Sequence, residues 1–350
     1  MRSYSQLTTG PPSPATLALT TVPAPSPSPT GTSLLLRITH AALNPIDLHL
    51  LLNLPAWLPF RRRPTPGFDF SGVVLALGPA VPASSGIKVG DRVAGSLGAR
   101  QVALGVGSLA EYISVPVGLV AKVPDGWDGG QAAGGMGVAG QTAVLFARTI
   151  GEERVKGARV LVNGASGGVG VLLVQVLKGL GAGWVVGVCG GGNEGMVRGL
   201  GADEVVDYGG EEARGEGGLE GVLEGKFGGE GRFDFVLDCA GGQRLFERSV
   251  GFLKEGGRFV SIVGGRSQGV VPFVRNKLRP VMLGGTPRRY DLLAMMPSGE
   301  QAEVMKGWME KGVVKEVPVD SEWVMEDVIK AYEKLETKHA KGKIIVKVAA

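Results

Sequence analysis

The sequence predicts an α/β protein built from an antiparallel, barrel-like domain and a doubly wound parallel sheet. Two features of the chain predict this. Short strand-like runs separated by proline and glycine fill the first third, whereas strand-like and helical runs alternate beyond residue 126. At 350 residues with 44% hydrophobic content, the chain is long enough for two hydrophobic cores. We expect residues 1–126 and 267–350 to form one discontinuous domain, with residues 127–266 inserted as the second.

The strands of the first domain are predicted from residues suited to strands, bounded by turn-forming residues. Pro23 to Pro29 is too rich in proline for a strand and is expected to be a loop. The closing run Lys343 to Val348 alternates like an ordinary strand and is expected to close this domain. The other strands are expected at Arg2 to Thr8, Thr16 to Val22, Leu34 to Thr39, Phe70 to Leu77, Arg92 to Gly95 and Glu111 to Val115.

The second domain is predicted from its alternation of strands and helices, which favours a parallel sheet with helices on both faces. Gln131 to Ile150 has the small residues and apolar spacing of one packed helix. Gly209 to Gly231 is so rich in Gly and Glu that we expect a loosely ordered helix and loop. Strands are expected at Arg159 to Val162, Trp184 to Cys189, Phe233 to Asp238 and Arg258 to Val263, and helices at Val171 to Leu180 and Met196 to Leu200.

Composition excludes several classes of protein. The 37 Lys and Arg against 33 Asp and Glu give a net charge of +4, which is weak support for a nucleic-acid partner. Two cysteines are too few for a disulfide framework or a four-thiolate zinc site. No run approaches the ~18 apolar residues of a membrane helix, and the N-terminus lacks a signal-peptide core. We expect a cytoplasmic protein, with a mitochondrial location left open.

A glycine turn separates a predicted strand from a predicted helix at Leu161 to Gly170, LVNGASGGVG. Gly164, Gly167 and Gly170 are spaced three apart, and Ala165 takes up part of the turn. Glycine lets the backbone turn tightly and approach a pyrophosphate, while the N-terminus of the following helix favours negative charge. Strand, turn and helix together predict a dinucleotide-binding site.

The end of the next strand bears on the choice of cofactor. An NAD enzyme usually carries an acidic residue about 20 residues past the glycine turn, where it holds the ribose 2′-hydroxyl. This region has no carboxylate to repel a 2′-phosphate, because it consists of Val188, Cys189, Gly190, Gly191, Gly192 and Asn193. NADP is therefore favoured, and NAD stays open because the loop has no Arg or Lys either.

The chain resembles the zinc-independent quinone oxidoreductase branch of the medium-chain dehydrogenase/reductase superfamily. The landmarks occur in order along the whole chain: MRSYSQLTT, HAALNPIDLHL, PGFDFSGVVLALG, VGDRV, GSLAEYISVP, VLVNGASGGVG, LGADEVVDY, FDFVLDCAG, GGRFVSIVGG and GKIIVKV. The resemblance implies a GroES-like barrel formed from both chain ends, a Rossmann domain between them, and a cleft where nicotinamide meets substrate. Similar enzymes commonly form homodimers by edge pairing of their Rossmann sheets.

The resemblance also implies which residues contact the cofactor. Tyr208 matches a tyrosine that faces the 2′-phosphate in relatives, Asn193 lies in the adenosine loop, and Lys343 fits a position near the cofactor. Gly190 to Gly192 depart from the pattern, since many relatives carry Ser, Thr and Lys or Arg there, so a weaker NADPH preference is expected. The pyrophosphate turn is matched by Ala165, Ser166, Gly167, Gly168, Val169 and Gly170, and the nicotinamide side by Cys239, Ala240, Val263, Gly264 and Gly265.

No catalytic zinc is expected. The positions that match the zinc ligands of alcohol dehydrogenases are Asn44 and Phe68, neither of which can serve. Hydride addition to a conjugated system needs no metal, because hydrogen-bond donors and water can stabilise and protonate the resulting anion. Asn44 is a candidate to orient the substrate carbonyl or the nicotinamide carboxamide, and Thr142 resembles a cofactor-contacting threonine. Tyr112 is either a proton donor or a barrel-packing aromatic, and Asp47 is expected to pin its loop.

We therefore expect an NADPH-dependent, zinc-independent reductase of a quinone or an α,β-unsaturated carbonyl. One alternative is a pathway-specific enoyl or ring-modifying reductase of biosynthesis, and another is a non-catalytic NADPH-binding protein. Leu48 to Phe60, LHLLLNLPAWLPF, is either an apolar lid over a small hydrophobic substrate or part of the barrel packing.

Overall fold

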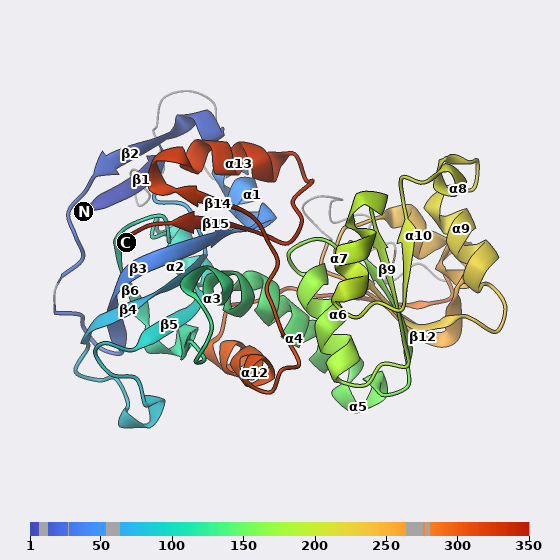
Figure 1. Ribbon diagram of the computed structural model, residues 1–350, viewed down its shortest axis with the longest axis horizontal. Helices are drawn as coiled ribbons and strands as arrows, with labels where there is room; N and C mark the ends of the chain where they lie inside the picture. The colour runs from blue at the N-terminus through green and yellow to red at the C-terminus, as the bar shows by residue number, and fades with distance from the viewer. Residues whose placement is uncertain (7–12, 27, 54–63, 264–275, 277–280, 350) are drawn as a thin grey trace. The chain divides into compact units, whose positions relative to one another are not determined.

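The computed structural model (Figure 1) describes residues 1–6, 13–26, 28–53, 64–263, 276 and 281–349. Its contacts divide the chain into two compact units. The first contains Met1–Gln141, Met296–Lys311 and Glu316–Ala350, and the second contains Thr142–Met295 and Gly312–Lys315. Both chain ends therefore belong to the first unit. The end of Leu48 to Phe60, together with Gly264 and Gly265, lies outside the described residues.

The first unit is built on a seven-stranded sheet. β3 (Ser33–Leu43) is its longest strand. It pairs with β4 along nearly its whole length, with β6 over its first half and with β15 near its end. The main strand order is β14-β15-β3-β4-β5-β7. β15 (Lys343–Lys347) joins it antiparallel to β3, which confirms that the end of the chain closes this domain. The other strands are β4 (Asp69–Leu77), β5 (Arg92–Ser96), β6 (Tyr112–Pro116), β7 (Val120–Lys122) and β14 (Val319–Val324), with β1 (Arg2–Gln6) and β2 (Leu17–Thr21) forming a separate hairpin-like sheet.

Helices cover this sheet and bury its apolar residues. α3 (Gly129–Met136) packs on β3, β4 and β15, and α13 (Val328–Glu336) packs on β15 and on α1 (Pro45–Asn53). Ile38, Phe70 and Tyr332 are fully buried in the shared core. The other helical segments are α2 (Ala99–Ala103), α12 (Gly299–Glu310) and the 3-10 turns Pro14–Thr16, Ala83–Ser85, Val117–Leu119 and Met325–Asp327.

The second unit is a doubly wound parallel sheet. Its order, β10-β9-β8-β11-β12-β13, is the 3-2-1-4-5-6 order of dinucleotide-binding folds, and every neighbouring pair is parallel. The strands are β8 (Arg159–Asn163), β9 (Trp184–Cys189), β10 (Glu204–Asp207), β11 (Phe233–Asp238), β12 (Leu253–Ser261) and β13 (Arg289–Leu292). The predicted α/β fold is thereby confirmed.

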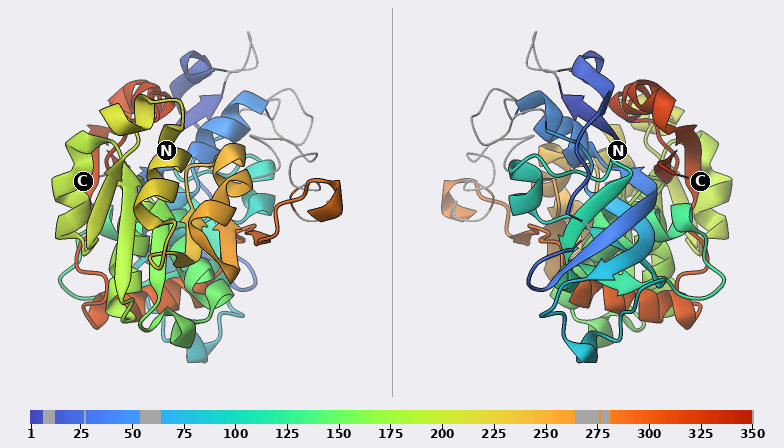
Figure 2. Two further views of the ribbon diagram at one scale, coloured as in Figure 1. Left: turned by 90° about the vertical axis from the view of Figure 1, so that its right-hand side faces the viewer. Right: turned by 90° about the vertical axis from the view of Figure 1, so that its left-hand side faces the viewer.

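Helices lie on both faces of this parallel sheet (Figure 2). They are α4 (Val138–Ile150), α5 (Glu152–Val155), α6 (Gly170–Gly179), α7 (Glu194–Gly199), α8 (Glu211–Arg214), α9 (Gly218–Phe227) and α10 (Gln243–Glu247), with 3-10 turns at Gly191–Asn193, Ser249–Gly251 and Val281–Leu283. Among the described residues, no helix combines the length and apolar character needed to cross a bilayer.

One prediction about the helices was wrong. Gln131 to Ile150 forms two helices, α3 and α4, because Gly137 between them has an extended conformation. A Cβ atom at Gly137 would lie 2.2 Å from the Asp69 side chain, so the break depends on glycine at this position. The missing side chain of Gly137 leaves room for the Asp69 carboxylate at the start of α4.

Candidate functional site

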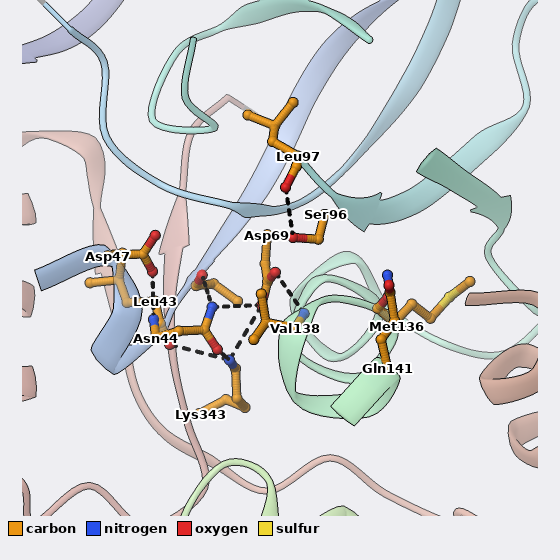
Figure 3. Close-up of polar contacts among 11 residues, drawn as sticks. Leu43, Asn44, Asp47, Asp69, Ser96, Leu97, Met136, Val138, Gln141 and Lys343 are labelled. Carbon is orange, nitrogen blue, oxygen red and sulfur yellow. Dashed lines mark hydrogen bonds and ion pairs between the residues drawn. The ribbon is translucent and has the colours of Figure 1, made fainter. Parts of the chain in front are cut away.

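Four polar side chains meet in the interior of the first unit (Figure 3). We call them the Asn44 cluster: Asn44, Asp47, Asp69 and Lys343. Asn44 follows β3, Asp47 lies in the first turn of α1, Asp69 begins β4, and Lys343 begins β15. Because β3 is antiparallel to both β4 and β15, its end lies beside the start of each. All four residues are at most 4% exposed.

The hydrogen bonds of the Asn44 cluster fix its orientation. Lys343 Nζ donates to Asn44 Oδ1 at 2.6 Å and to the Leu43 carbonyl at 3.2 Å, and it lies 3.5 Å from Asp69 Oδ2. Asn44 Nδ2 donates to Asp69 Oδ2 at 2.8 Å and, over a longer 3.4 Å, to the Ala42 carbonyl. A buried charge is costly unless it is paired and hydrogen-bonded, and here Lys343 and Asp69 compensate each other. The Asn44 amide therefore turns its oxygen toward the ammonium group and its nitrogen toward the carboxylate.

Asp69 also connects the cluster to the start of α4. Its Oδ1 accepts a hydrogen bond from the Val138 N–H at 2.8 Å, so a carboxylate lies at a helix N-terminus, where it is favoured. Burial raises the pKa of Asp69, while Lys343 and the hydrogen bond from Asn44 act in the opposite direction. The carboxylate is thus held by one cation, one amide and one helix N-terminus.

Asp47 is the second buried carboxyl of the cluster. Its Oδ2 accepts the Asn44 backbone N–H at 2.6 Å, which confirms the expected pinning of this loop. Burial, followed by the nearby Asp69 carboxylate, raises the pKa of Asp47 to about 7, against the opposing effect of that hydrogen bond and of Lys343. Asp47 is therefore a group whose charge changes near neutral pH.

Two of the predicted site residues, Asn44 and Lys343, lie in the Asn44 cluster, whereas Tyr112 and Thr142 do not. Lys343, expected near the cofactor, is buried there. Tyr112 is half-buried on β6 opposite Arg37, which lies near the middle of β3, whereas Asn44 follows the end of that strand. Thr142 belongs to α4 and to the second unit, and it is 3% exposed.

The predicted glycine turn lies between β8 and α6 in the second unit. Gly164 has a φ of +80°, and its N–H and that of Ala165 donate to the Val188 carbonyl of the neighbouring strand at 3.1 and 2.9 Å. Gly167 N–H donates to the Gly164 carbonyl at 3.1 Å. A Cβ atom at Gly170 would lie 2.2 Å from that carbonyl oxygen. These residues and the intervening Ser166, Gly168 and Val169 therefore form a tight turn onto a helix N-terminus, the geometry that accepts a pyrophosphate.

Two more predicted cofactor residues lie beside this turn. Asn193 Nδ2 donates to Ser166 Oγ at 3.2 Å, which joins the loop after β9 to the glycine turn. Asn193 Oδ1 is buried and has no hydrogen-bond partner among the described residues. Tyr208 follows β10 and is 53% exposed, and its hydroxyl would lie 3.6 Å from a Cβ atom at Gly190.

A carboxylate not anticipated in this region comes from the neighbouring strand. Asp207, the last residue of β10, pairs in register with Cys189. Its Oδ1 accepts the Gly209 N–H at 2.8 Å, and its Oδ2 would lie 2.4 Å from a Cβ atom at Gly191. Asp207 is not among the residues that follow β9 in the sequence. The parallel pairing of the two strands places it beside those residues.

The carboxyl ends of β8, β11 and β12 are tied together by Asp238. It accepts hydrogen bonds from the side chains of Asn163 and Ser261, both at 2.8 Å, and from the Ala240 and Gly241 N–H groups. Burial is the main cause that raises the pKa of Asp238. This network holds the predicted residues Cys239, Ala240 and Val263 at one edge of the sheet, where ligands of such sheets bind. Burial raises the pKa of the Cys239 thiol well above its usual range, which argues against a reactive thiolate.

Sequence reasoning assigned no role to Asp69 or Asp207. Each is an acidic residue next to apolar strand residues, in FDF and VVDY, and such placement is a signal that the side chain has a specific partner. The sequence does not identify these partners. Those of Asp69 come from segments distant in sequence, and the loop beside Asp207 follows a neighbouring strand.

Two family descriptions match this chain. Residues 30–125 match the alcohol dehydrogenase GroES-like domain, and residues 200–346 match the zinc-binding dehydrogenase family. A quinone oxidoreductase from Coxiella burnetii is similar in structure, with a TM-score of 0.78, 25% identity and coverage of 100% of this chain and 99% of the other.

Two fungal relatives match nearly the whole chain. The trans-enoyl reductase poxH of Penicillium oxalicum is 31% identical, covering 90% of this chain and 89% of its own. The medium chain reductase pydE of an Acremonium species is also 31% identical, covering 91% and 90%. Together with the fold, these similarities show that the chain belongs to the medium-chain dehydrogenase/reductase superfamily and is an oxidoreductase.

Proposed function

We propose that the protein transfers hydride from NADPH to a quinone or an α,β-unsaturated carbonyl. The observation that carries this proposal is the glycine turn between β8 and α6, with Gly170 packed against Gly164 at the start of a helix. The relatives named as trans-enoyl reductase and quinone oxidoreductase support reduction of a conjugated system.

The residues around the turn fit a dinucleotide. The absence of a side chain at Gly170 lets the start of α6 pack against Gly164 and Ala165, and residues 165–170 would hold a pyrophosphate at the N-terminus of this helix. Asn193 Oδ1, buried without a partner among the described residues, is free to accept a hydrogen bond from a ligand. Tyr208 would face the adenosine end, with Cys239, Ala240, Val263, Gly264 and Gly265 toward the nicotinamide. When bound, the cofactor supplies the hydride from its nicotinamide ring.

The zinc suggested by the name of one matching family does not fit the residues at the expected position. Phe68 offers no donor atom and is packed in the core of the first unit. The Asn44 oxygen already accepts a hydrogen bond from the Lys343 ammonium group. We therefore propose that reduction proceeds without a metal, and we derive no step through one.

Asn44 is the proposed residue for polarising a carbonyl. Its strong hydrogen bonds, to Asp69 and Lys343, fix the amide, while the second N–H makes only a long contact of 3.4 Å with the Ala42 carbonyl. That N–H is the donor available to a carbonyl oxygen, whose charge grows as hydride is added. The anion formed is then protonated by water, and Thr142 is proposed to contact the cofactor. Tyr112 pairs with Arg37, seven residues before Asn44, and this position argues against its hydroxyl as the proton donor.

The test combines a substrate panel with two substitutions. NADPH oxidation would be followed with 9,10-phenanthrenequinone and with simple enones. Asn44→Ala should lower kcat by about 10²-fold because its N–H stabilises the transition state, whereas Tyr112→Phe should leave kcat unchanged because water supplies the proton. An unchanged kcat in Asn44→Ala would remove Asn44 from the mechanism, and a similar loss in Tyr112→Phe would assign the proton to Tyr112. Lack of oxidation with every substrate, despite binding, would favour the non-catalytic alternative.

A second candidate is a pathway-specific enoyl reductase. It is favoured by the two fungal relatives, which are named as a trans-enoyl reductase and a medium chain reductase. Strong selectivity among enones, with quinones turned over slowly, would support this narrower function. Equal rates across the panel would argue against it.

A further inference from the structure

We propose that Asp207 is a determinant of cofactor choice: its carboxylate disfavours the 2′-phosphate of NADPH and so limits the preference for NADPH over NADH. This inference rests on the proposed function, because it concerns where the ribose of that cofactor lies. In doubly wound folds, the residue that distinguishes the two cofactors follows the second strand of the sheet, which is β9 here.

The position of Asp207 carries the argument. β9 ends at Cys189, opposite Asp207 in the parallel register, and the loop that follows has no side chain at Gly190, Gly191 or Gly192. A Cβ atom at Gly191 would lie 2.4 Å from Asp207 Oδ2. The carboxylate thus occupies the space into which a side chain at position 191 would project. β10, the strand next to β9, thus supplies the acidic group that NAD enzymes carry at the end of the second strand itself.

The surroundings leave the negative charge of Asp207 unopposed. Within the described part of the chain, Asp207 forms no ion pair, and Arg198 in α7, the helix between β9 and β10, is paired with Glu194. Burial, followed by the charges of Asp207 and Glu194, raises the pKa of the Cys189 thiol to about 11, so both carboxylates lie close enough to this strand end to act on it. A phosphate dianion placed here would be repelled, whereas a ribose hydroxyl could donate a hydrogen bond to the carboxylate.

A purely structural role of Asp207 predicts a different outcome from an electrostatic one. Its Oδ1 accepts the Gly209 N–H at 2.8 Å, as in an Asx turn. Asparagine can accept the same hydrogen bond without the charge. Asp207→Asn therefore removes the repulsion and keeps the turn. A matched control is Glu204→Gln, which removes one charge from the first residue of the same strand, at its opposite end.

The experiment measures the dissociation constants of NADPH and NADH by fluorescence titration in the wild-type protein and the two variants. We expect Asp207→Asn to shift the NADPH:NADH affinity ratio toward NADPH by about tenfold at low salt, and by less at high salt, because salt screens the repulsion. Glu204→Gln should leave the ratio unchanged. An unchanged ratio in Asp207→Asn, or an equal shift in both variants, would overturn the inference.

A second variant keeps the test decisive if Asp207→Asn folds poorly. A Cβ atom at Gly192 would meet nothing within 4 Å, so Gly192→Arg can start a side chain there and add a cation to the same loop. It should also shift the ratio toward NADPH, and no shift would contradict the assignment of the ribose to this loop. Binding of neither dinucleotide to the wild-type protein would instead overturn the proposed function, so the two failures are distinguishable.

Discussion

The Asn44 cluster and the glycine turn are built in opposite ways. The cluster joins three separate stretches of the chain, the end of β3 with α1, the start of β4 and the start of β15, and depends on charges that compensate one another away from water. The turn is one continuous stretch, Gly164 to Gly170, whose geometry depends on the absence of side chains. Substitution of a charged residue of the cluster should therefore act mainly on stability, and substitution in the turn mainly on ligand binding.

The largest expected effect is that of Lys343→Met. Removing the ammonium group leaves Asp69 buried without its cation, so we expect the free energy of unfolding to fall by roughly 3–5 kcal/mol. Urea unfolding measures this loss. Lys347→Met on the same strand removes an exposed ion pair with Glu322 and should cost less than about 1 kcal/mol. Equal losses in the two variants would contradict the view that the cluster is held by charge compensation.

The next largest effect is the pH dependence that Asp47 gives to the free energy of unfolding. The unfolded chain releases the Asp47 proton at its ordinary pKa, whereas the folded protein holds it until about pH 7, so Asp47 makes stability fall as pH rises between these values. Asp47→Asn lacks this contribution. Its free energy of unfolding relative to wild type should therefore rise by up to about 4 kcal/mol from pH 4 to pH 7 and stay level above.

The control variant, Asp91→Asn, should change its stability relative to wild type in the opposite direction as pH rises. The hydrogen bond from Lys122 lowers the pKa of Asp91, so this carboxylate stabilises the fold at neutral pH, and that stabilisation is lost as pH falls through its lowered pKa. Relative to wild type, Asp91→Asn should lose stability with rising pH, by less than about 1 kcal/mol because the pair is exposed. Parallel slopes for the two variants would show that burial of Asp47 is not the cause.

Of the three test variants, the one in the turn, Gly170→Ala, should change stability least, although by more than the two exposed controls. Gly170→Ala forces the Gly164 carbonyl to move, which should cost roughly 1–3 kcal/mol of stability and weaken NADPH binding. The matched control is Gly195→Ala, whose Cβ atom meets nothing within 4 Å. NADPH titration alongside thermal unfolding separates the two effects. If both variants bind NADPH as tightly as wild type, Gly170 does not shape a phosphate site.

The contrast between the two sites also explains what the sequence could predict. The parallel sheet, the return of Lys343 to Val348 and the glycine turn were predicted because each depends on a local pattern. The break at Gly137 was missed because it depends on Asp69, a residue far away in sequence. For the same reason, the position of Lys343 in a buried cluster and that of Asp207 beside Gly191 required the strand order and register.

The most direct test of the account is a parallel titration of the wild-type protein with NADPH and NADH, followed by addition of 9,10-phenanthrenequinone or an enone while nicotinamide absorbance is monitored. The account predicts saturable binding, oxidation of the bound cofactor on addition of the acceptor, and weaker binding in Gly170→Ala but not in Gly195→Ala. Absence of binding by either dinucleotide would contradict the central claim that the turn between β8 and α6 holds a nicotinamide cofactor.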